Sequence, residues 1–295
     1  MRPPPISKYA RHETRVCLRH FKTNLRHAAK HSGDPGGIHD LRVSIRRLTQ
    51  CFRIFRDLLD PSPVKKLRRR LHKIMENCGS VRNCDIALEL LEEGGLAQSP
   101  SVSKLKTSRE EAARKLRRNL KKERRRHHRA ISTAARRPPH DWQIATRLPA
   151  LGADFFQTGS AATAPGSSYQ TLHRFRLRAK RFRYTLERFE CFYGSEMAAG
   201  TKALKGLQDR LGAINDCVTT IDLLADDPPA VAAIQKLLDQ RTYAFHSYWR
   251  NRFTPQKRAW WQRWLSHPLT EPRAPASGPL KATSTASSGT AAHPG

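Results

Sequence analysis

The chain has 295 residues, and its 55 Lys and Arg against 25 Asp and Glu give a formal net charge of +30. Such a charge points to a polyanionic partner, which leaves nucleic acid, an anionic membrane surface and inorganic polyphosphate as candidates. No run approaches the roughly 18 apolar residues that a membrane-spanning helix needs, and the start Met1-Arg2-Pro3-Pro4-Pro5 lacks the apolar region of a secretory signal, so we expect a cytoplasmic protein.

The first half of the chain carries helical periodicity and almost no strand signal. Clusters of Gly and Pro interrupt this periodicity, as at Asp60-Pro61-Ser62-Pro63 and at Gly94-Gly95. The helices predicted between such breaks span residues 7–31, 38–59, 64–78, 81–93 and 101–131. Because Gly79 separates two of these segments, we expect four helices in residues 7–137, the third of them broken at this glycine.

The second half, residues 141–265, repeats this plan. A helix that Asp226-Asp227-Pro228-Pro229 opens is predicted to reach about residue 250. The other predicted helices span residues 141–158, 169–192, 197–211, 214–225 and 255–265, with a loop of small residues at 159–168. Residues 266–295 are dominated by Pro, Ala, Ser, Thr and Gly, which predicts a disordered tail.

A basic motif occurs once in each half at the same spacing. The two copies are His39-x-x-Arg42-x-x-x-Arg46-Arg47 and His173-x-x-Arg176-x-x-x-Lys180-Arg181. At about 100° per residue, the histidine and the cations three and seven positions later share one helix face, beside an apolar stripe. A solvated amphipathic helix is the ordinary interpretation of either copy alone. The repeat in one register instead favours two matching faces that converge on one anionic ligand.

A second internal match supports a duplication. The segment Gly79-Ser80-Val81-Arg82-Asn83-Cys84-Asp85 matches Gly212-Ala213-Ile214-Asn215-Asp216-Cys217-Val218 at an offset close to that of the basic motifs. Each half then contains one four-helix unit, and two such units bury their apolar stripes within and between bundles. We therefore predict an all-α fold of two four-helix bundles that arose by internal duplication.

These residues resemble the CHAD domain family, the conserved-histidine α-helical domains. The basic motifs look like the paired signatures of the family, and Leu204 to Gly212 with Asn215-Asp216 looks like its Leu-Gln-x-x-Leu-Gly stretch. Val81 to Asp85 resembles its Arg-Asp-x-Asp segment, with Asn83 where Asp is usual. The resemblance covers residues 7–265.

The resemblance implies two pseudo-symmetric four-helix bundles whose basic faces line a central groove or pore. It further implies that the ligand is inorganic polyphosphate and that the protein associates with intracellular polyphosphate granules. Some relatives carry a triphosphate tunnel domain with a Glu-x-Glu-x-Lys type of motif. Because the chain lacks this motif, it looks like a stand-alone member.

The candidate site residues follow from the chemistry of phosphate. Arginine forms forked, charge-assisted hydrogen bonds to phosphate oxygens, lysine supplies a point charge, and histidine donates from a ring nitrogen. We expect the inner stripe to consist of His39, Arg42, Arg46, His173, Arg176 and Lys180. Flanking contacts are expected from Arg47 and Arg181, and further contacts from Arg82, Arg109, Lys205 and Arg241. For these last four, a surface position or a salt bridge is the alternative.

The sequence offers no basis for catalysis. We find no Ser-His-Asp order, no phosphate-cradling Gly-rich loop, no carboxylate pair suited to a metal and no Cys or His cluster with zinc spacing. The six cysteines are expected to be buried free thiols, and Asp209 and Asp216 to orient cations. We therefore predict a binding protein without a metal or cofactor rather than an enzyme.

Two other functions stay open. The run from Lys104 to Arg137 contains 15 Lys or Arg and three Glu, which indicates either a solvated helix or an electrostatic collar that speeds capture of a polyanion. Phosphate contacts alone would make a non-specific nucleic-acid-binding protein whose affinity falls steeply with salt. An enzyme of phosphate metabolism, or an accessory protein of one, is the other alternative.

Overall fold

A computed structural model describes residues 6–31, 34–125, 144–189, 193 and 197–267. All regular elements within these ranges are helical, so the predicted all-α class is confirmed. The helices are α1 Ile6–Lys30, α2 Pro35–Ile54, η1 Arg56–Leu58, α3 Pro61–Glu93, α4 Pro100–Arg124, α5 Ile144–Ala162, α6 Tyr169–Arg188, α7 Met197–Leu223, α8 Pro228–Arg252 and α9 Pro255–Leu265. The predicted tail lies outside the described residues except at positions 266 and 267, as does the predicted end of the fourth helix.

The two predicted helix breaks at Gly79 and Gly212 are wrong. Gly79 lies inside the continuous helix α3, and Gly212 lies inside the continuous helix α7. A glycine in a helix interior costs about 1 kcal/mol relative to alanine, which is too little to stop a helix whose apolar stripe is buried on both sides. In α3 that stripe includes Ile74 before the glycine and Leu90 after it. Each half therefore contains one long uninterrupted helix.

Three Asp-Pro pairs and the pair Ser99-Pro100 begin helices and supply their N-caps. The carboxylate of Asp34 accepts hydrogen bonds from the first amides of α2, and Asp60 accepts one from the amide of Ser62 at 3.0 Å in α3. The proline that follows each cap needs no hydrogen-bond partner for its nitrogen and has the φ that the first helical position requires. Helices α2 and α3 consequently begin three residues earlier than the predicted starts at 38 and 64.

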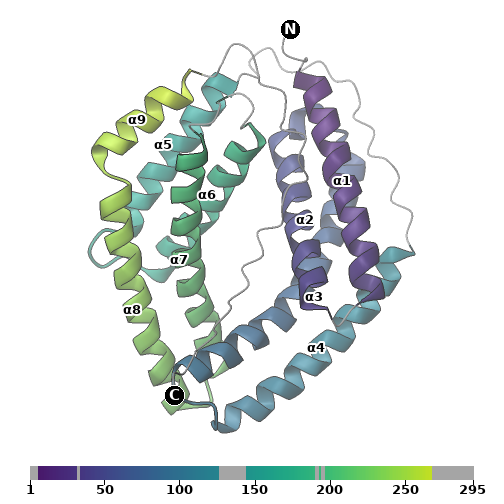
Figure 1. Cartoon of the computed structure of the whole chain (residues 1–295), viewed down its shortest axis with the longest axis vertical. Helices are drawn as coiled ribbons and strands as arrows, with labels where there is room; N and C mark the ends of the chain where they lie inside the picture. Colours follow the sequence, from purple (N-terminus) through teal and green to yellow (C-terminus); the bar gives the residue numbers. More distant parts are fainter. Residues whose placement is uncertain (1–5, 32–33, 126–143, 190–192, 194–196, 268–295) are drawn as a thin grey trace, which may run out of the picture.

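The helices pack mainly within each half of the chain, and contacts from α2 and α3 join the first half to the second (Figure 1). In the first half α1 packs on α2 and α4, and α3 packs on α2 and α4. In the second half α5 packs on α6 and α9, and α7 packs on α6 and α8. Helix α2 contacts α6, while α3 contacts α7 and α8. These arrangements are compatible with two bundles, and the predicted duplication stays an interpretation of the sequence.

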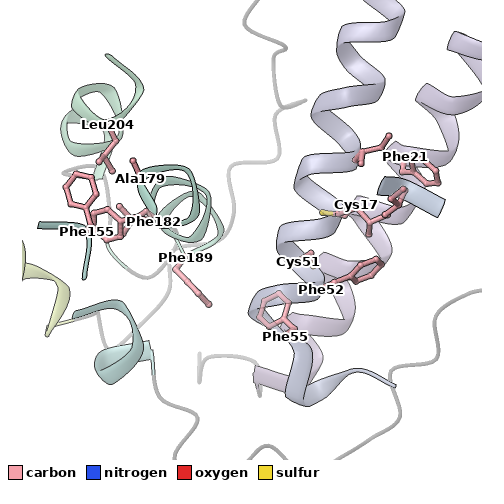
Figure 2. Packing of buried hydrophobic residues seen from close by; sticks show 14 of the residues in the cluster. Cys17, Phe21, Cys51, Phe52, Phe55, Phe155, Ala179, Phe182, Phe189 and Leu204 are labelled. Carbon is pink, nitrogen blue, oxygen red and sulfur yellow. The ribbon is translucent and has the colours of Figure 1, made fainter. Parts of the chain in front are cut away.

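The apolar stripes beside both basic motifs are buried, as predicted. The buried residues are Leu41, Ile45, Leu48, Phe52 and Phe55 of the first copy and Phe175, Ala179, Phe182, Leu186 and Phe189 of the second. Figure 2 shows Cys17 and Phe21 of α1 beside the first stripe, and Phe155 of α5 beside the second. Each large apolar side chain that leaves water stabilises the fold by about 1.5–3 kcal/mol. Burial of these stripes fixes the rotation of α2 and α6 and turns their basic faces away from the core.

A second, smaller core joins the far ends of the two halves. It contains Leu90 of α3, Leu105 of α4, Cys217 of α7 and Ile234 of α8. The five cysteines in the described ranges are buried free thiols, in agreement with the prediction, while Cys191 lies outside them. Within the described part of the chain, no helix combines the length and the apolar character that crossing a membrane requires.

Candidate anion-binding site

The two motif helices, α2 and α6, are held together by a buried glutamine. The side-chain amide of Gln50 on α2 donates to the Thr185 hydroxyl of α6 at 3.0 Å and to the Arg181 carbonyl at 3.4 Å. Arg188, at the end of α6, forms an ion pair with Glu13 of α1. A buried amide that lost its partners would be costly, so these bonds fix how the two helices meet.

A pocket of about 1020 Å³, which we call the α2–α3 pocket, lies between α2, α3 and α6. Its lining includes Arg46 and Arg53 of α2, Lys180 and Arg181 of α6, and a row of cations on α3. No Asp or Glu is among the described residues that line it. Positive charge gathered in a concave surface attracts anions more strongly than the same charge on a flat one.

A second pocket of about 460 Å³, which we call the α3–α7 pocket, has a mixed lining. Its cations include Arg82, and its carboxylates are Glu89, Glu93, Asp209 and Asp216. Two of these carboxylates are engaged, because Glu89 pairs with Arg82 at 3.0 Å and Glu93 pairs with an arginine of α8. The two pockets therefore differ in electrostatic character.

Three residues line both pockets and mark where they meet: Arg46, Lys180 and Tyr184. Arg46 is the second cation of the first motif, and Lys180 occupies the equivalent position in the second. Among the described residues, neither cation forms an ion pair with a carboxylate. We call this pair the Arg46–Lys180 junction. Here the two motif copies present cations without an ion-pair partner among the described residues to the same space.

Lys180 carries its charge at a high free-energy cost. Burial, together with repulsion from Arg176 and Arg46, lowers the pKa of its ammonium group to about 7, while Asp216 opposes the shift. Burial also raises the pKa of Asp216, against the attraction of Arg176. An anion at the junction would favour the ammonium form of Lys180, because an opposite charge nearby stabilises the charged state.

Arg42 and Arg176, one helical turn before the junction residues, are partly buried. Burial lowers the pKa of both guanidinium groups, and Arg46 contributes in the same direction. Arg42 Nη1 and Arg176 Nε are buried atoms without a hydrogen-bond partner in the described part of the chain. Buried donors of a charged group are normally satisfied, so these two N–H groups can donate hydrogen bonds to a ligand oxygen.

Comparison with known proteins places this fold. A family model for the CHAD domain matches residues 14–225. The chain belongs to the CHAD domain family. The crystal structure of the CHAD domain from the plant Ricinus communis is similar over 90% of this chain and 94% of that chain, with a TM-score of 0.57 and 22% identity. PptA from Streptomyces chartreusis is similar over 86% and 99% of the two chains, with a TM-score of 0.54 and 16% identity. No curated protein matches the chain significantly.

The two histidines of the CHAD motifs do not line the pockets that meet at the junction. His39 is exposed near the start of α2. His173 lines a separate pocket of about 660 Å³ with Tyr169, whose hydroxyl donates to Asn215 at 3.3 Å. The structure therefore gathers the Arg and Lys positions of the CHAD motifs more closely than their histidines. The roles of both histidines stay predictions.

The other predicted residues have different surroundings. Arg181 lines the α2–α3 pocket, whereas Arg47 lies near Cys17 and His20 on the α1 side of α2. Lys205 is exposed on α7 and lines neither pocket. These predicted flanking and further contacts are thus divided between the α2–α3 pocket, the α1 side of α2 and the surface of α7.

Arg109 and Arg241 form the salt bridges that were the alternative to ligand binding. Arg109 pairs with Asp85, which raises the pKa of its guanidinium group. Arg241 of α8 donates to Glu93 of α3 at 2.6 Å and to the Ala213 carbonyl of α7 at 3.3 Å. Arg109 therefore joins α4 to α3, and Arg241 joins α8 to α3 and α7.

Sequence reasoning missed several residues in and around the α2–α3 and α3–α7 pockets. Tyr184 lines both pockets, and the guanidinium carbon of Arg183 lies 4.5 Å from the centre of its ring. Gln208, in the Leu-Gln stretch, donates to the Ala179 carbonyl at 2.9 Å and accepts from Arg183 at 2.8 Å. Gln208 therefore positions α6 against α7. A pattern search for cations on α3 would have found the row in the α2–α3 pocket.

Proposed function

We propose that this CHAD protein binds inorganic polyphosphate at the Arg46–Lys180 junction. One observation carries the proposal: equivalent cations from both motif copies lie together without a carboxylate partner among the described residues. Arginine and lysine at such a site form strong, charge-assisted hydrogen bonds to phosphate oxygens. Through this polymer the protein is expected to associate with polyphosphate granules.

The aromatic residues of the α2–α3 pocket favour polyphosphate over nucleic acid. Single-stranded nucleic-acid binders stack bases on accessible aromatic rings. Phe52, the Phe that lines this pocket, is buried in the core, and the ring of Tyr184 is covered on one side by Arg183. The pocket thus offers cations for phosphates and a poor platform for bases.

The proposal is tested by the binding of labelled long-chain polyphosphate at about 0.15 M salt, with duplex DNA and RNA as competitors. We expect tight binding that an excess of nucleic acid, matched by phosphate concentration, does not displace. We also expect Arg46→Gln with Lys180→Gln to weaken binding at least about 100-fold, because two desolvated phosphate contacts are lost. Equal displacement by DNA, RNA and polyphosphate would contradict a shaped polyphosphate site.

A matched control uses cations outside both pockets. Arg117 and Lys121 are exposed on α4, one turn apart, so Arg117→Gln with Lys121→Gln removes the same charge from the surface. This control should change affinity by less than about threefold. An equal loss in the two double variants would mean that net charge, rather than the junction, determines binding.

Non-specific nucleic-acid binding is the second candidate, and the basic face of α4 favours it. Lys115, Arg117, Arg118, Lys121 and Lys122 are all exposed there. If this face rather than the junction binds the polymer, the α4 variant should lose the larger share of DNA affinity, with a smaller salt dependence.

A binding role without turnover is part of the proposal. We expect polyphosphate incubated with the protein and Mg²⁺ to keep its chain length and to release no orthophosphate. Sustained release of orthophosphate, absent from the Arg46→Gln and Lys180→Gln variant, would establish an enzyme instead.

A further inference from the structure

The two pockets that meet at the Arg46–Lys180 junction differ in the charge that they present to a bound polyanion. Among the described residues, the α2–α3 pocket has no carboxylate in its lining, whereas the α3–α7 pocket has four. A phosphate chain that runs through this pocket passes Asp216, a partly buried carboxylate whose repulsion is poorly screened by water. Charge therefore favours one direction out of the junction.

A row of cations on α3 lines the favoured side. Lys65, Arg68, Arg69 and His72 all line the α2–α3 pocket, at the i, i+3, i+4 and i+7 spacing of one helix face. The row spans about 10 Å at 1.5 Å per residue. Arg53 of α2 lines the same pocket, and its pKa is lowered by burial and by the nearby Arg181 and Arg68.

Most cations of this row have no carboxylate partner among the described residues. Within the described residues, Lys65, Arg68 and Arg69 form no ion pair, while His72 lies 3.3 Å from exposed Glu76, which does not line the pocket. Arg56, at the rim, pairs with Asp57 at 3.1 Å. Mutual repulsion between Arg53, Arg68 and Arg181 is relieved when a polyanion lies among them.

We propose that a long polyphosphate chain leaves the Arg46–Lys180 junction in one direction, through the α2–α3 pocket and along Lys65, Arg68 and Arg69 of α3. This inference rests on the proposed function and adds its path and its chain-length selectivity. A short chain fills the junction alone, whereas a long chain also contacts the α3 row. The row therefore increases the affinity for long chains over short ones.

The chain offers a matched pair of variants on one helix. Lys65→Glu with Arg68→Glu reverses two charges inside the α2–α3 pocket, and Lys66→Glu with Lys73→Glu reverses two exposed charges of α3 that do not line it. All four positions are exposed, and Glu is a good helix former, so both proteins should fold with unchanged helicity. Binding of tripolyphosphate and of long-chain polyphosphate is measured for each at about 0.15 M salt.

We expect the Lys65 and Arg68 variant to lose at least about tenfold in affinity for the long chain, and less than about threefold for tripolyphosphate. The slope of log affinity against log salt for the long chain should fall by about one to two, one unit or less for each lost contact. The Lys66 and Lys73 variant should bind both ligands within about threefold of the wild type.

Two outcomes overturn the inference while the proposed function survives. Equal losses of long-chain affinity in the two variants would show that the path does not follow this face of α3. Equal losses for tripolyphosphate and long chains would show that the row belongs to the central site and gives no length selectivity. Failure of the wild type to bind either ligand would instead refute the proposed function itself.

Discussion

The residue that best links structure to binding is Lys180. Its ammonium group lies in a partly buried cluster with Arg46 and Arg176, and Asp216 supplies the opposing charge. A cation whose pKa falls to about 7 is poorly stabilised by the protein alone. Binding of an anion and protonation of Lys180 should therefore be coupled.

This coupling predicts that polyphosphate affinity falls as the pH rises from about 6 to about 9. Below pH 7 the free protein already holds the proton on Lys180, whereas above pH 7 binding must take one up. Lys180→Arg keeps the charge throughout this range, so it should flatten the profile. Titrations of both proteins across this range test the prediction, and identical profiles would show that Lys180 is not the group that couples protonation to binding.

The lowered pKa of Lys180 also predicts that the free energy of unfolding changes with pH. The pKa of Lys180 is lower in the folded protein than the usual value of about 10.4 for an unfolded chain, so the unfolded state binds more protons between these two values. Stability therefore rises with pH through this window, and the full penalty applies below pH 7.

Lys180→Met removes that penalty and should raise the Tm at pH 6 by about 2–4 °C while weakening polyphosphate binding. Lys66→Met, at an exposed position on α3, is the control and should leave both properties unchanged. Thermal unfolding, monitored by circular dichroism, measures the Tm of both variants. A lower Tm in Lys180→Met would show that the ammonium group is stabilised in the empty protein.

At the residue scale, the sequence predicted which helix faces carry cations but not which cations lie together. The repeat identified Arg46 and Lys180, because helix periodicity and an apolar stripe determine which side of a helix faces outward. It did not predict that Arg241 is bound by Glu93, since 148 positions separate the two residues. Pairing of this kind depends on tertiary packing.

At the scale of elements, long α3 supports the proposed site on both sides. Its first half carries Lys65 and Arg68 in the α2–α3 pocket, and its second half carries Arg82 and Glu89 in the α3–α7 pocket. A break at Gly79 would uncouple these halves. Helix continuity through this glycine therefore matters to how the pockets meet.

Because α3 continues through Gly79, we predict that Gly79→Ala stabilises the protein by about 0.5–1 kcal/mol. Alanine has the higher helix propensity, and its Cβ would meet no other atom within 4 Å. Gly159→Ala is the contrasting variant, since its Cβ would overlap the ring of Trp249. It should destabilise the fold by about 1–3 kcal/mol. Chemical denaturation measures both changes, and destabilisation by Gly79→Ala would indicate that the helix needs flexibility there.

Helix boundaries were predicted less well than helix existence, and the reason is local. The sequence shows Asp60-Pro61 as an interruption, and the same pair is compatible with the end of one helix or the start of the next. The structure uses it as a start, because the Asp60 carboxylate accepts the Ser62 amide hydrogen bond. A capping interpretation of each Asp-Pro pair would have placed these boundaries correctly.

At the scale of the whole molecule, α2 contacts α6 across the two halves, and α3 contacts α7 and α8. Gln50 of α2 bonds to Thr185 of α6, and Arg241 of α8 bonds to Glu93 of α3 near the smaller core. The sequence repeat predicted matching halves, but it contains no information about how they dock. The docking brings α2 beside α6 and thereby creates the Arg46–Lys180 junction.

The central claim is that both motif copies serve one binding site, and calorimetric titration with tripolyphosphate tests it most directly. We predict a single binding event with one ligand per chain, which Arg46→Gln and Lys180→Gln each weaken by about tenfold or more. Two binding events per chain, one lost with each variant, would contradict the account, because each motif copy would then hold a ligand of its own.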